Sequence, residues 1–179
     1  MREIEIKARV ADKEALFIRL NELGFELSKP VKQHDVVFGW PGAMDSVVGS
    51  VWLRIRTEND TKSIFTLKKS IVGHLDSIEH ETVVEDVDEL EKIIIEMGYE
   101  LYSDLTKIRQ KAKQGNIEIC LDELEGLGSF IEAEKIMERD SDHDEVVAEL
   151  WELFEKLGLS NEDEVHEGYD VLERRKRGL

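Results

Sequence analysis

The chain has 179 residues, with 41 Asp and Glu against 24 Lys and Arg, which gives a formal net charge of −17 at pH 7. A surface this acidic repels nucleic-acid phosphates and anionic lipids, so we expect neither nucleic acid nor a membrane as partner. No apolar run approaches the roughly 20 residues of a membrane-spanning helix. The length suits one domain with its own core, and we expect residues 1–179 to form a single domain.

The compartment follows from two further features. The charged start Met1-Arg2-Glu3-Ile4-Glu5 lacks the apolar stretch of a signal peptide. Cys120 is the only cysteine, so the chain cannot form an internal disulfide. We therefore expect a cytoplasmic protein, and the sequence leaves its oligomeric state open as a monomer or a homodimer.

One plan occurs three times along the chain: a Glu-x-Glu strand, then an amphipathic helix, then a glycine. The strands contain Glu3-Ile4-Glu5-Ile6-Lys7, Glu79-His80-Glu81 and Glu132-Ala133-Glu134. The predicted helices are Asp12 to Leu23, Asp86 to Met97 and Ser141 to Leu157. Their apolar residues recur at helical spacing, which predicts helices that pack on the domain's own sheet.

Most other segments are rich in strand-forming residues and are interrupted by turn residues. The predicted strands are Val36 to Trp40, Val51 to Thr57, Ser63 to Lys68, Lys107 to Lys113 and Asn116 to Asp122. Pro41 to Gly49 is predicted to be a mobile loop, and its neighbour Trp40 is a candidate for stacking on a substrate ring. The basic tail Glu173 to Arg177 is expected to be solvated.

Charged and apolar residues alternate along these strands, which places them on opposite faces of the sheet. Each strand alone fits an ordinary sheet with its charges in water. The strands taken together do not fit that arrangement. The three helices must bury their apolar stripes against the apolar faces of the strands, which leaves every charged face on the other side of the sheet. A long antiparallel sheet also twists and curls. We therefore predict an α+β fold in which a curled barrel has helices outside and charges inside.

A charged interior of this kind suits a ligand. Burying unpartnered ions costs several kcal/mol each, roughly, whereas a water-filled passage with a bound ligand removes that cost. Lysine and arginine match phosphate oxygens. Carboxylate clusters match hard divalent cations, and Mg²⁺ commonly bridges carboxylates to substrate phosphates. The combination predicts a metal-bound polyphosphate.

The motifs Glu3-Ile4-Glu5-Ile6-Lys7, Leu53-Arg54-Ile55-Arg56 and Gly126-Leu127-Gly128-Ser129-Phe130-Ile131-Glu132-Ala133-Glu134 resemble those of the CYTH family, the triphosphate tunnel metalloenzymes. This resemblance covers nearly the whole chain and implies an eight-stranded antiparallel barrel. It implies a divalent cation, Mg²⁺ or Mn²⁺, bound by Glu3, Glu5, Glu81, Asp122, Glu132 and Glu134. It implies a triphosphate bound by Lys7, Asp35, Arg54, Arg56, Lys68, Lys107 and Arg109. Among these residues, Glu3, Glu5, Lys7, Lys68 and Arg109 are the catalytic candidates.

Two reactions fit such a site. Attack of the ribose 3′-hydroxyl on the α-phosphorus of ATP gives cyclic AMP, as in class IV adenylyl cyclases. Attack of water hydrolyses tripolyphosphate, thiamine triphosphate or a nucleoside triphosphate. The resemblance favours the cyclase, the hydrolase is the alternative, and a non-catalytic polyphosphate-binding module is a third reading. The family often has Asp-x-Tyr-Phe-Asp at Asp35 to Gly39 and Ser-Tyr at Gly168-Tyr169, so the resemblance implies the tunnel but not the contacts to the outer part of the substrate. Cys120 has no evident paired histidine, so we expect no nucleophilic role for it.

Overall fold

The computed structural model describes residues 2–42, 48–71, 76–137 and 142–178. The strands are β1 (Arg2–Arg9), β2 (Val31–Gly39), β3 (Val51–Glu58), β4 (Lys62–Ser70), β5 (Asp76–Val84), β6 (Glu100–Gln114), β7 (Ile117–Leu124) and β8 (Gly128–Met137). The helices in the described residues are α1 (Lys13–Glu22), α2 (Val87–Glu96), α3 (His143–Lys156), the 3₁₀ turn η1 (Asn161–Asp163) and α4 (Tyr169–Lys176). Residues 43–47 of the predicted loop and Ser141 of the third predicted helix lie outside the described residues.

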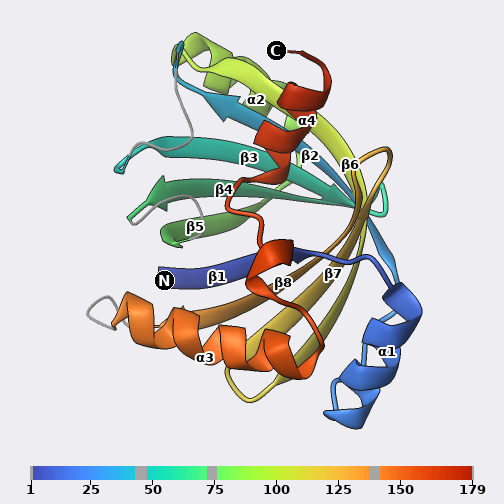
Figure 1. Cartoon of the computed structure of the whole chain (residues 1–179). Helices are drawn as coiled ribbons and strands as arrows, with labels where there is room; N and C mark the ends of the chain where they lie inside the picture. The colour runs from blue at the N-terminus through green and yellow to red at the C-terminus, as the bar shows by residue number, and fades with distance from the viewer. Residues whose placement is uncertain (1, 43–47, 72–75, 138–141, 179) are drawn as a thin grey trace. The chain divides into compact units, whose positions relative to one another are not determined.

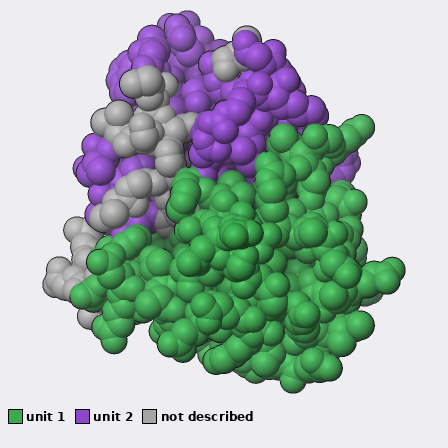
Figure 2. Space-filling view, viewed as in Figure 1, with its two compact units in different colours: residues 1–30, 108–166 green, residues 31–107, 167–179 purple. Residues whose placement is uncertain are grey.

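The strands are ordered β1-β5-β4-β3-β2-β6-β7-β8 in one sheet, and that sheet closes into a barrel (Figure 1). The neighbouring strands β1 and β8, β7 and β8, and β2 through β5 pair antiparallel. The predicted eight-stranded antiparallel barrel with its α+β composition is therefore confirmed. The chain divides into two compact units, shown in green and purple in Figure 2. Unit 1 comprises residues 1–30 and 108–166, and unit 2 comprises residues 31–107 and 167–179.

Unit 1 has an apolar core between one face of β1, β7 and β8 and the helices α1 and α3. Ile4, Ile119 and Ile131 of the strands are buried together with Leu20 of α1 and Phe154 of α3. In the ribbon view α3 runs along β1 and β8, which it contacts (Figure 1). These helices pack on the apolar face, so the alternating charged side chains of the same strands lie on the opposite face. We call this opposite face the charged face of unit 1.

A glycine at the end of α3 makes room for a contact with α1. Gly158 follows α3 with a φ of +81°, a conformation that side-chain-bearing residues avoid. A Cβ added there would come within 1.6 Å of Nη1 of Arg19, which belongs to α1. That nitrogen donates to the carbonyl oxygen of Leu157 at 2.8 Å. The glycine therefore makes room for a guanidinium that caps the end of α3.

Unit 2 repeats the arrangement with different elements. The side chain of Asp86 accepts a hydrogen bond from the backbone N–H of Glu89 at 2.9 Å and so begins α2. Ile94 of this helix is buried in a core cluster that includes Phe38 of β2 and Leu53 of β3. Here too the helix packs on the apolar face, and the arginines that alternate with Leu53 along β3 lie on the other one. We call it the charged face of unit 2.

Two sequence predictions need correction. Strand β6 spans Glu100–Gln114, whereas the sequence predicted only Lys107 to Lys113, because the polar residues of its first half hide the strand signal. The prediction that the basic tail is solvated is wrong for Arg174, which lies in α4. Its guanidinium is 4.3 Å from the ring centroid of Tyr102, and its Nη1 donates to the carbonyl oxygen of Tyr102 at 2.9 Å. A cation–π contact and a backbone hydrogen bond thus hold α4 on β6.

Candidate functional site

A row of glutamates crosses the charged face of unit 1. Glu134 on β8 lies directly opposite Glu5 on β1 and directly opposite Glu118 on β7. We call these three residues the acidic row. Like charges directly opposite each other in an antiparallel sheet destabilise it. The sequence pattern placed the residues on one face, and the strand register adds that their carboxylates are neighbours.

The acidic row strongly perturbs its central member. Burial, followed by the charges of Glu5 and Glu3, raises the pKa of Glu134 to about 8 from its ordinary value of 4.5. Arg109 and Lys111 act in the opposite direction without cancelling this shift. The carboxyl group of Glu134 therefore retains its proton near neutral pH unless a further cation approaches. Such a position suits a divalent cation, which can replace the proton.

Next to the acidic row lies a buried group of alternating charges. Nε of Arg109 donates to Oδ1 of Asp122 at 2.6 Å, and its Nη2 donates to Oδ2 of Asp122 and to Oε2 of Glu132. The other oxygen of Glu132 lies 3.2 Å from Nζ of Lys7, which is itself 3.6 Å from Oε1 of Glu5. Burial lowers the pKa of Arg109, but the charges of Asp122 and Glu132 outweigh burial and hold that pKa well above its usual range. Arg109 thus bridges two carboxylates, each of which was predicted to bind metal.

Cys120 faces the same carboxylates. Its thiol is fully buried and donates to Oε1 of Glu118 at 3.9 Å. Burial, and after it the nearby charges of Glu134 and Glu132, raise the pKa of this thiol far above its ordinary value, against the opposing charge of Arg109. The predicted absence of a nucleophilic role agrees with this environment, because the thiolate is the reactive form. Among the described residues, Glu118, Cys120 and Glu134 are the group whose ligand atoms all lie within 4.8 Å of one another.

In unit 2, Asp35 and Arg56 form a two-point ion pair. They lie directly opposite each other on β2 and β3, and Nε and Nη2 of Arg56 each donate to one oxygen of Asp35 at 2.7 Å. Burial raises the pKa of Asp35, but the charge and hydrogen bonds of Arg56, with the charges of Lys107 and Arg54, hold it well below its usual range. Asp35 is therefore ionised at all ordinary pH values, and both its oxygens are engaged by Arg56.

Arg54 and Lys68 lie beside a second pair of carboxylates in unit 2. Nζ of Lys68 is 2.9 Å from Oε1 of Glu79, and Nη2 of Arg54 is 3.5 Å from Oε1 of Glu81. Burial raises the pKa of Glu79, but the charges of Lys68 and Arg54 outweigh it and lower that pKa to about 2. Thr66 connects Arg54 to Glu81, because its hydroxyl accepts from Arg54 at 3.2 Å and donates to Glu81 at 2.8 Å.

One nitrogen of Arg54 stands apart from this network. Its Nε is buried and has no hydrogen-bond acceptor in the part of the chain that the structure describes. Buried donors are nearly always satisfied in native proteins, so an unsatisfied one needs an explanation. A guanidinium presents its donors in a planar fork that matches a phosphate oxygen. The donor set of unit 2 therefore fits an anion.

Lys107 and Trp40 each lie against an aromatic ring of unit 2. Nζ of Lys107 is 4.8 Å from the ring centroid of Tyr169, the first residue of α4. Trp40, expected as a candidate for stacking on a substrate ring, is half-exposed and stacks on Tyr99 with ring centroids 4.7 Å apart. One face of the Trp40 ring is thus used in packing.

Each unit contains one group of the predicted site residues. The charged face of unit 1 carries Glu3, Glu5, Lys7, Arg109, Asp122, Glu132 and Glu134, and that of unit 2 carries Asp35, Arg54, Arg56, Lys68, Glu81 and Lys107. The predicted convergence of both groups on one water-filled cavity stays a prediction. Sequence reasoning missed Glu118 and Cys120 as ligand candidates. The signal that identifies them is their alternate spacing with Asp122 on the same strand, which places all three side chains on one face.

Comparison with known proteins identifies relatives along almost the whole chain. The model of the CYTH domain matches residues 1–169. A Methanocaldococcus jannaschii protein named as a putative adenylate cyclase is 30% identical over 171 residues, covering 94% of this chain and 97% of the relative. The solved PH1012 protein of Pyrococcus horikoshii superposes with a TM-score of 0.81 at 28% identity, covering 95% of this chain and 98% of that one.

A more distant structure shares the fold. A Hippeastrum protein, described as a putative adenylyl cyclase with a dominant triphosphatase activity, superposes with a TM-score of 0.61 at 18% identity, covering 99% of this chain and 96% of that one. The resemblance seen in the sequence motifs is thus confirmed by family, relative and fold. In the described part of the chain, none of the helices combines the length and the apolar composition that a membrane crossing requires.

Proposed function

Because the chain belongs to the CYTH family, we propose that it is a metal-dependent enzyme that converts ATP to cyclic AMP and pyrophosphate. The relative named as an adenylate cyclase supports this reaction, because the two chains align over nearly their full lengths. Hydrolysis of a triphosphate is the second candidate, and the activity described for the Hippeastrum protein favours it. Both reactions depend on positioning and charge neutralisation more than on covalent chemistry by the protein.

The acidic row is the observation that carries the proposal. Glu5, Glu134 and Glu118 lie side by side across three strands, and burial keeps a proton on Glu134. We assign the divalent cation to Glu5 and Glu134, with Glu3 and Glu132 beside them. Mg²⁺ or Mn²⁺ bound there supplies Lewis-acid stabilisation of phosphate charge. The carboxylates hold and orient the cation, and Lys7, between Glu5 and Glu132, keeps two of them in place.

We assign the phosphate chain to the basic side chains. Arg54 is the first choice in unit 2, since its buried Nε lacks an acceptor in the described residues. Asp35 changes role in this proposal: both of its oxygens accept from Arg56, so it orients that guanidinium and does not contact substrate itself. In unit 1 the corresponding cations are Lys7 and Arg109.

Phosphorus NMR of the purified protein distinguishes the candidate reactions. ATP, tripolyphosphate and thiamine triphosphate are each incubated with Mg²⁺ and then with Mn²⁺. The cyclase predicts cyclic AMP and pyrophosphate from ATP. Formation of ADP and phosphate alone, with either metal, would replace the cyclase by the triphosphatase. Undiminished turnover in excess EDTA would reject the metal assignment, and binding without turnover of any of the three would indicate a polyphosphate-binding module.

Replacing Arg54 by glutamine is expected to weaken tripolyphosphate binding by about 10- to 100-fold, as for the loss of one charge-assisted hydrogen bond. The reason is that Nε of Arg54 is a buried donor that no acceptor in the described residues satisfies, so it can donate to a phosphate oxygen. Isothermal calorimetry with Mg²⁺ present measures the affinity. Arg177→Gln is the matched control, because this exposed arginine pairs with Glu173 in α4's last turn. Equal affinities of wild type and Arg54→Gln would remove Arg54 from the phosphate site.

A further inference from the structure

The group Glu118, Cys120 and Glu134 has a chemistry that a magnesium site does not need. Two carboxylates and one thiol converge, with all ligand atoms within 4.8 Å of one another. A tetrahedral ion with ordinary Zn–S and Zn–O distances holds these ligands about 3.6 Å apart. Sγ of Cys120 and Oε1 of Glu118 are 3.9 Å apart in the structure. The three side chains are therefore within a small adjustment of a metal-binding geometry.

A second observation also points to a cation. Glu118 on β7 lies directly opposite Glu134 on β8, so their two carboxyl groups are neighbours on one face of the sheet. Two ionised carboxyl groups this close repel each other, and a divalent cation between them relieves that repulsion. The thiol of Cys120 is fully buried beside this pair.

We propose that Glu118, Cys120 and Glu134 form a site for a thiophilic divalent cation such as Zn²⁺, and that this cation inhibits the enzyme by occupying Glu134. The inhibition rests on the proposed function, because Glu134 belongs to both the magnesium site and the thiophilic site. Thiolate ligands select zinc and softer ions, whereas Mg²⁺ prefers oxygen ligands and gains nothing from sulfur. Cys120 thereby makes the response of this chain to zinc differ from its response to magnesium.

The protons and charges balance without any further reactant. The cation binds the Cys120 sulfur as thiolate and the two glutamates as carboxylates, and the displaced protons go to solvent. Three anionic ligands then surround a charge of +2, and a water completes the tetrahedron. Lys111 is the competing cation, since its Nζ pairs with Oε1 of Glu118. Its side chain is 45% exposed, so it can turn to solvent when the ion enters.

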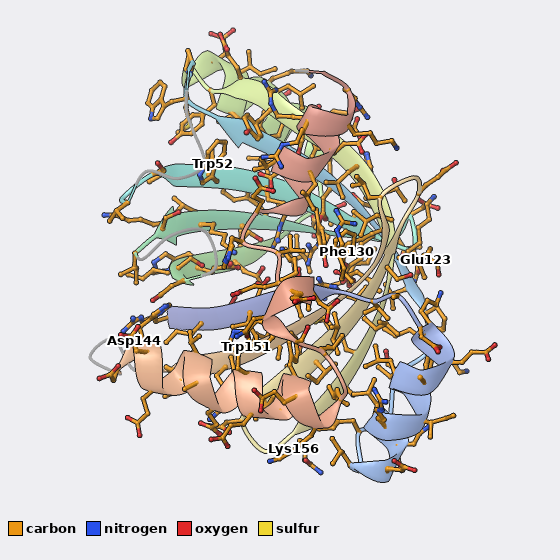
Figure 3. The ribbon with its side chains drawn as sticks, viewed as in Figure 1. Trp52, Glu123, Phe130, Asp144, Trp151 and Lys156 are labelled. Atoms are coloured by element: carbon orange, nitrogen blue, oxygen red, sulfur yellow. The ribbon has the colours of Figure 1, made fainter. Side chains whose placement is uncertain are left out.

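Cadmium titration of the metal-free full-length protein tests the site, because a cadmium–thiolate bond has an ultraviolet charge-transfer band that carboxylates do not give. We expect the band to saturate at one Cd²⁺ per chain and to be displaced by Zn²⁺. Cys120→Ser should abolish the band, and Glu118→Gln should weaken Cd²⁺ binding by about 10- to 100-fold. Glu123→Gln is the matched control on the same strand: Glu123, labelled in Figure 3, is exposed and pairs with Lys13.

Inhibition is measured separately, as the loss of Mg²⁺-dependent turnover on adding Zn²⁺, and excess Mg²⁺ should raise the Zn²⁺ concentration needed. A wild-type protein without the cadmium band would overturn the site, and this result does not depend on whether any variant folds. Turnover with Mg²⁺ but no cadmium band leaves the proposed function intact and removes this inference. A cadmium band without turnover of any triphosphate keeps the site and removes both the enzyme and its inhibition. A full cadmium band with unaltered turnover would overturn the inhibition.

Discussion

Replacing Glu134 by glutamine is expected to lower metal-dependent turnover by about 100-fold or more, because a neutral amide cannot supply the charge that Mg²⁺ binding needs. The same substitution is expected to raise the stability of the metal-free protein. The gain is expected as pH rises toward 8 and above, where Glu134 ionises beside Glu5 and Glu3 and its removal relieves their repulsion. A loss of activity together with a gain in stability distinguishes a metal ligand from a residue that supports the fold.

The stability effect has a defined pH window. The pKa of Glu134 is about 8 in the folded protein against an ordinary value of 4.5, so the folded state binds more protons between these values. The free energy of unfolding of the metal-free wild type therefore falls as pH rises from 4.5 to 8, and changes little below or above on this account. We expect a fall on the order of 5 kcal/mol. Asp35 and Glu79 act oppositely but at lower pH, because their folded-state pKa values are lowered.

Urea unfolding of metal-free protein at several pH values measures this effect. Glu134→Gln should remove most of the fall, and Glu5→Gln should reduce it by relieving the same repulsion. Glu123→Gln, an exposed charge on β7, should change neither turnover nor the pH profile. A Glu134→Gln protein that keeps full turnover, or that loses stability across this whole pH range, would contradict the assignment of Glu134 as a metal ligand.

Because side chains alternate along a strand, the sequence predicts which of them share a face of the sheet. Alternation of Ile4 and Ile6 with Glu5 and Lys7 fixes which side chains share a face, and the structure places them as predicted. The starts of the first two helices were also predicted, at Asp12 and Asp86, and the side chains of these residues accept hydrogen bonds from the first turn of each helix. These features depend on residues close in sequence, where period and capping rules apply directly.

Pairing across strands could not be read in the same way. That Glu134 lies opposite both Glu5 and Glu118 depends on the register of three strands far apart in the chain. A shift by two residues keeps the same face and would have placed Glu132 there, so parity alone leaves the metal-ligand set undetermined. For the same reason the family resemblance implied a metal role for Asp122 and a phosphate role for Arg109 without showing that the two residues form a buried pair. Helix α4 was missed because its basic residues suggested solvent, and aromatic partners such as Tyr102 lie far away in sequence.

Replacing Arg109 by alanine is expected to destabilise the metal-free protein by about 3–5 kcal/mol, the typical cost of leaving a buried charge without its partner. Asp122 is fully buried and Glu132 nearly so, and Arg109 donates to both. Urea unfolding measures the loss. Lys111→Ala is the matched control from the same strand: its ion pair with Glu118 is exposed, and such pairs contribute about 0–1 kcal/mol. Arg109→Lys should fall between them, because it keeps the charge but loses the two-point geometry.

Divalent metal gives the destabilised variant a second, opposite response. Without Arg109, Asp122 and Glu132 become two adjacent buried carboxylates, which suit Mg²⁺. A ligand that binds only the folded state stabilises it in proportion to the logarithm of its concentration over the dissociation constant. Mg²⁺ should therefore raise the melting temperature of Arg109→Ala more than that of wild type. Equal shifts in both proteins, or an Arg109→Ala protein as stable as Lys111→Ala, would mean that Asp122 and Glu132 do not depend on Arg109 for their charge balance.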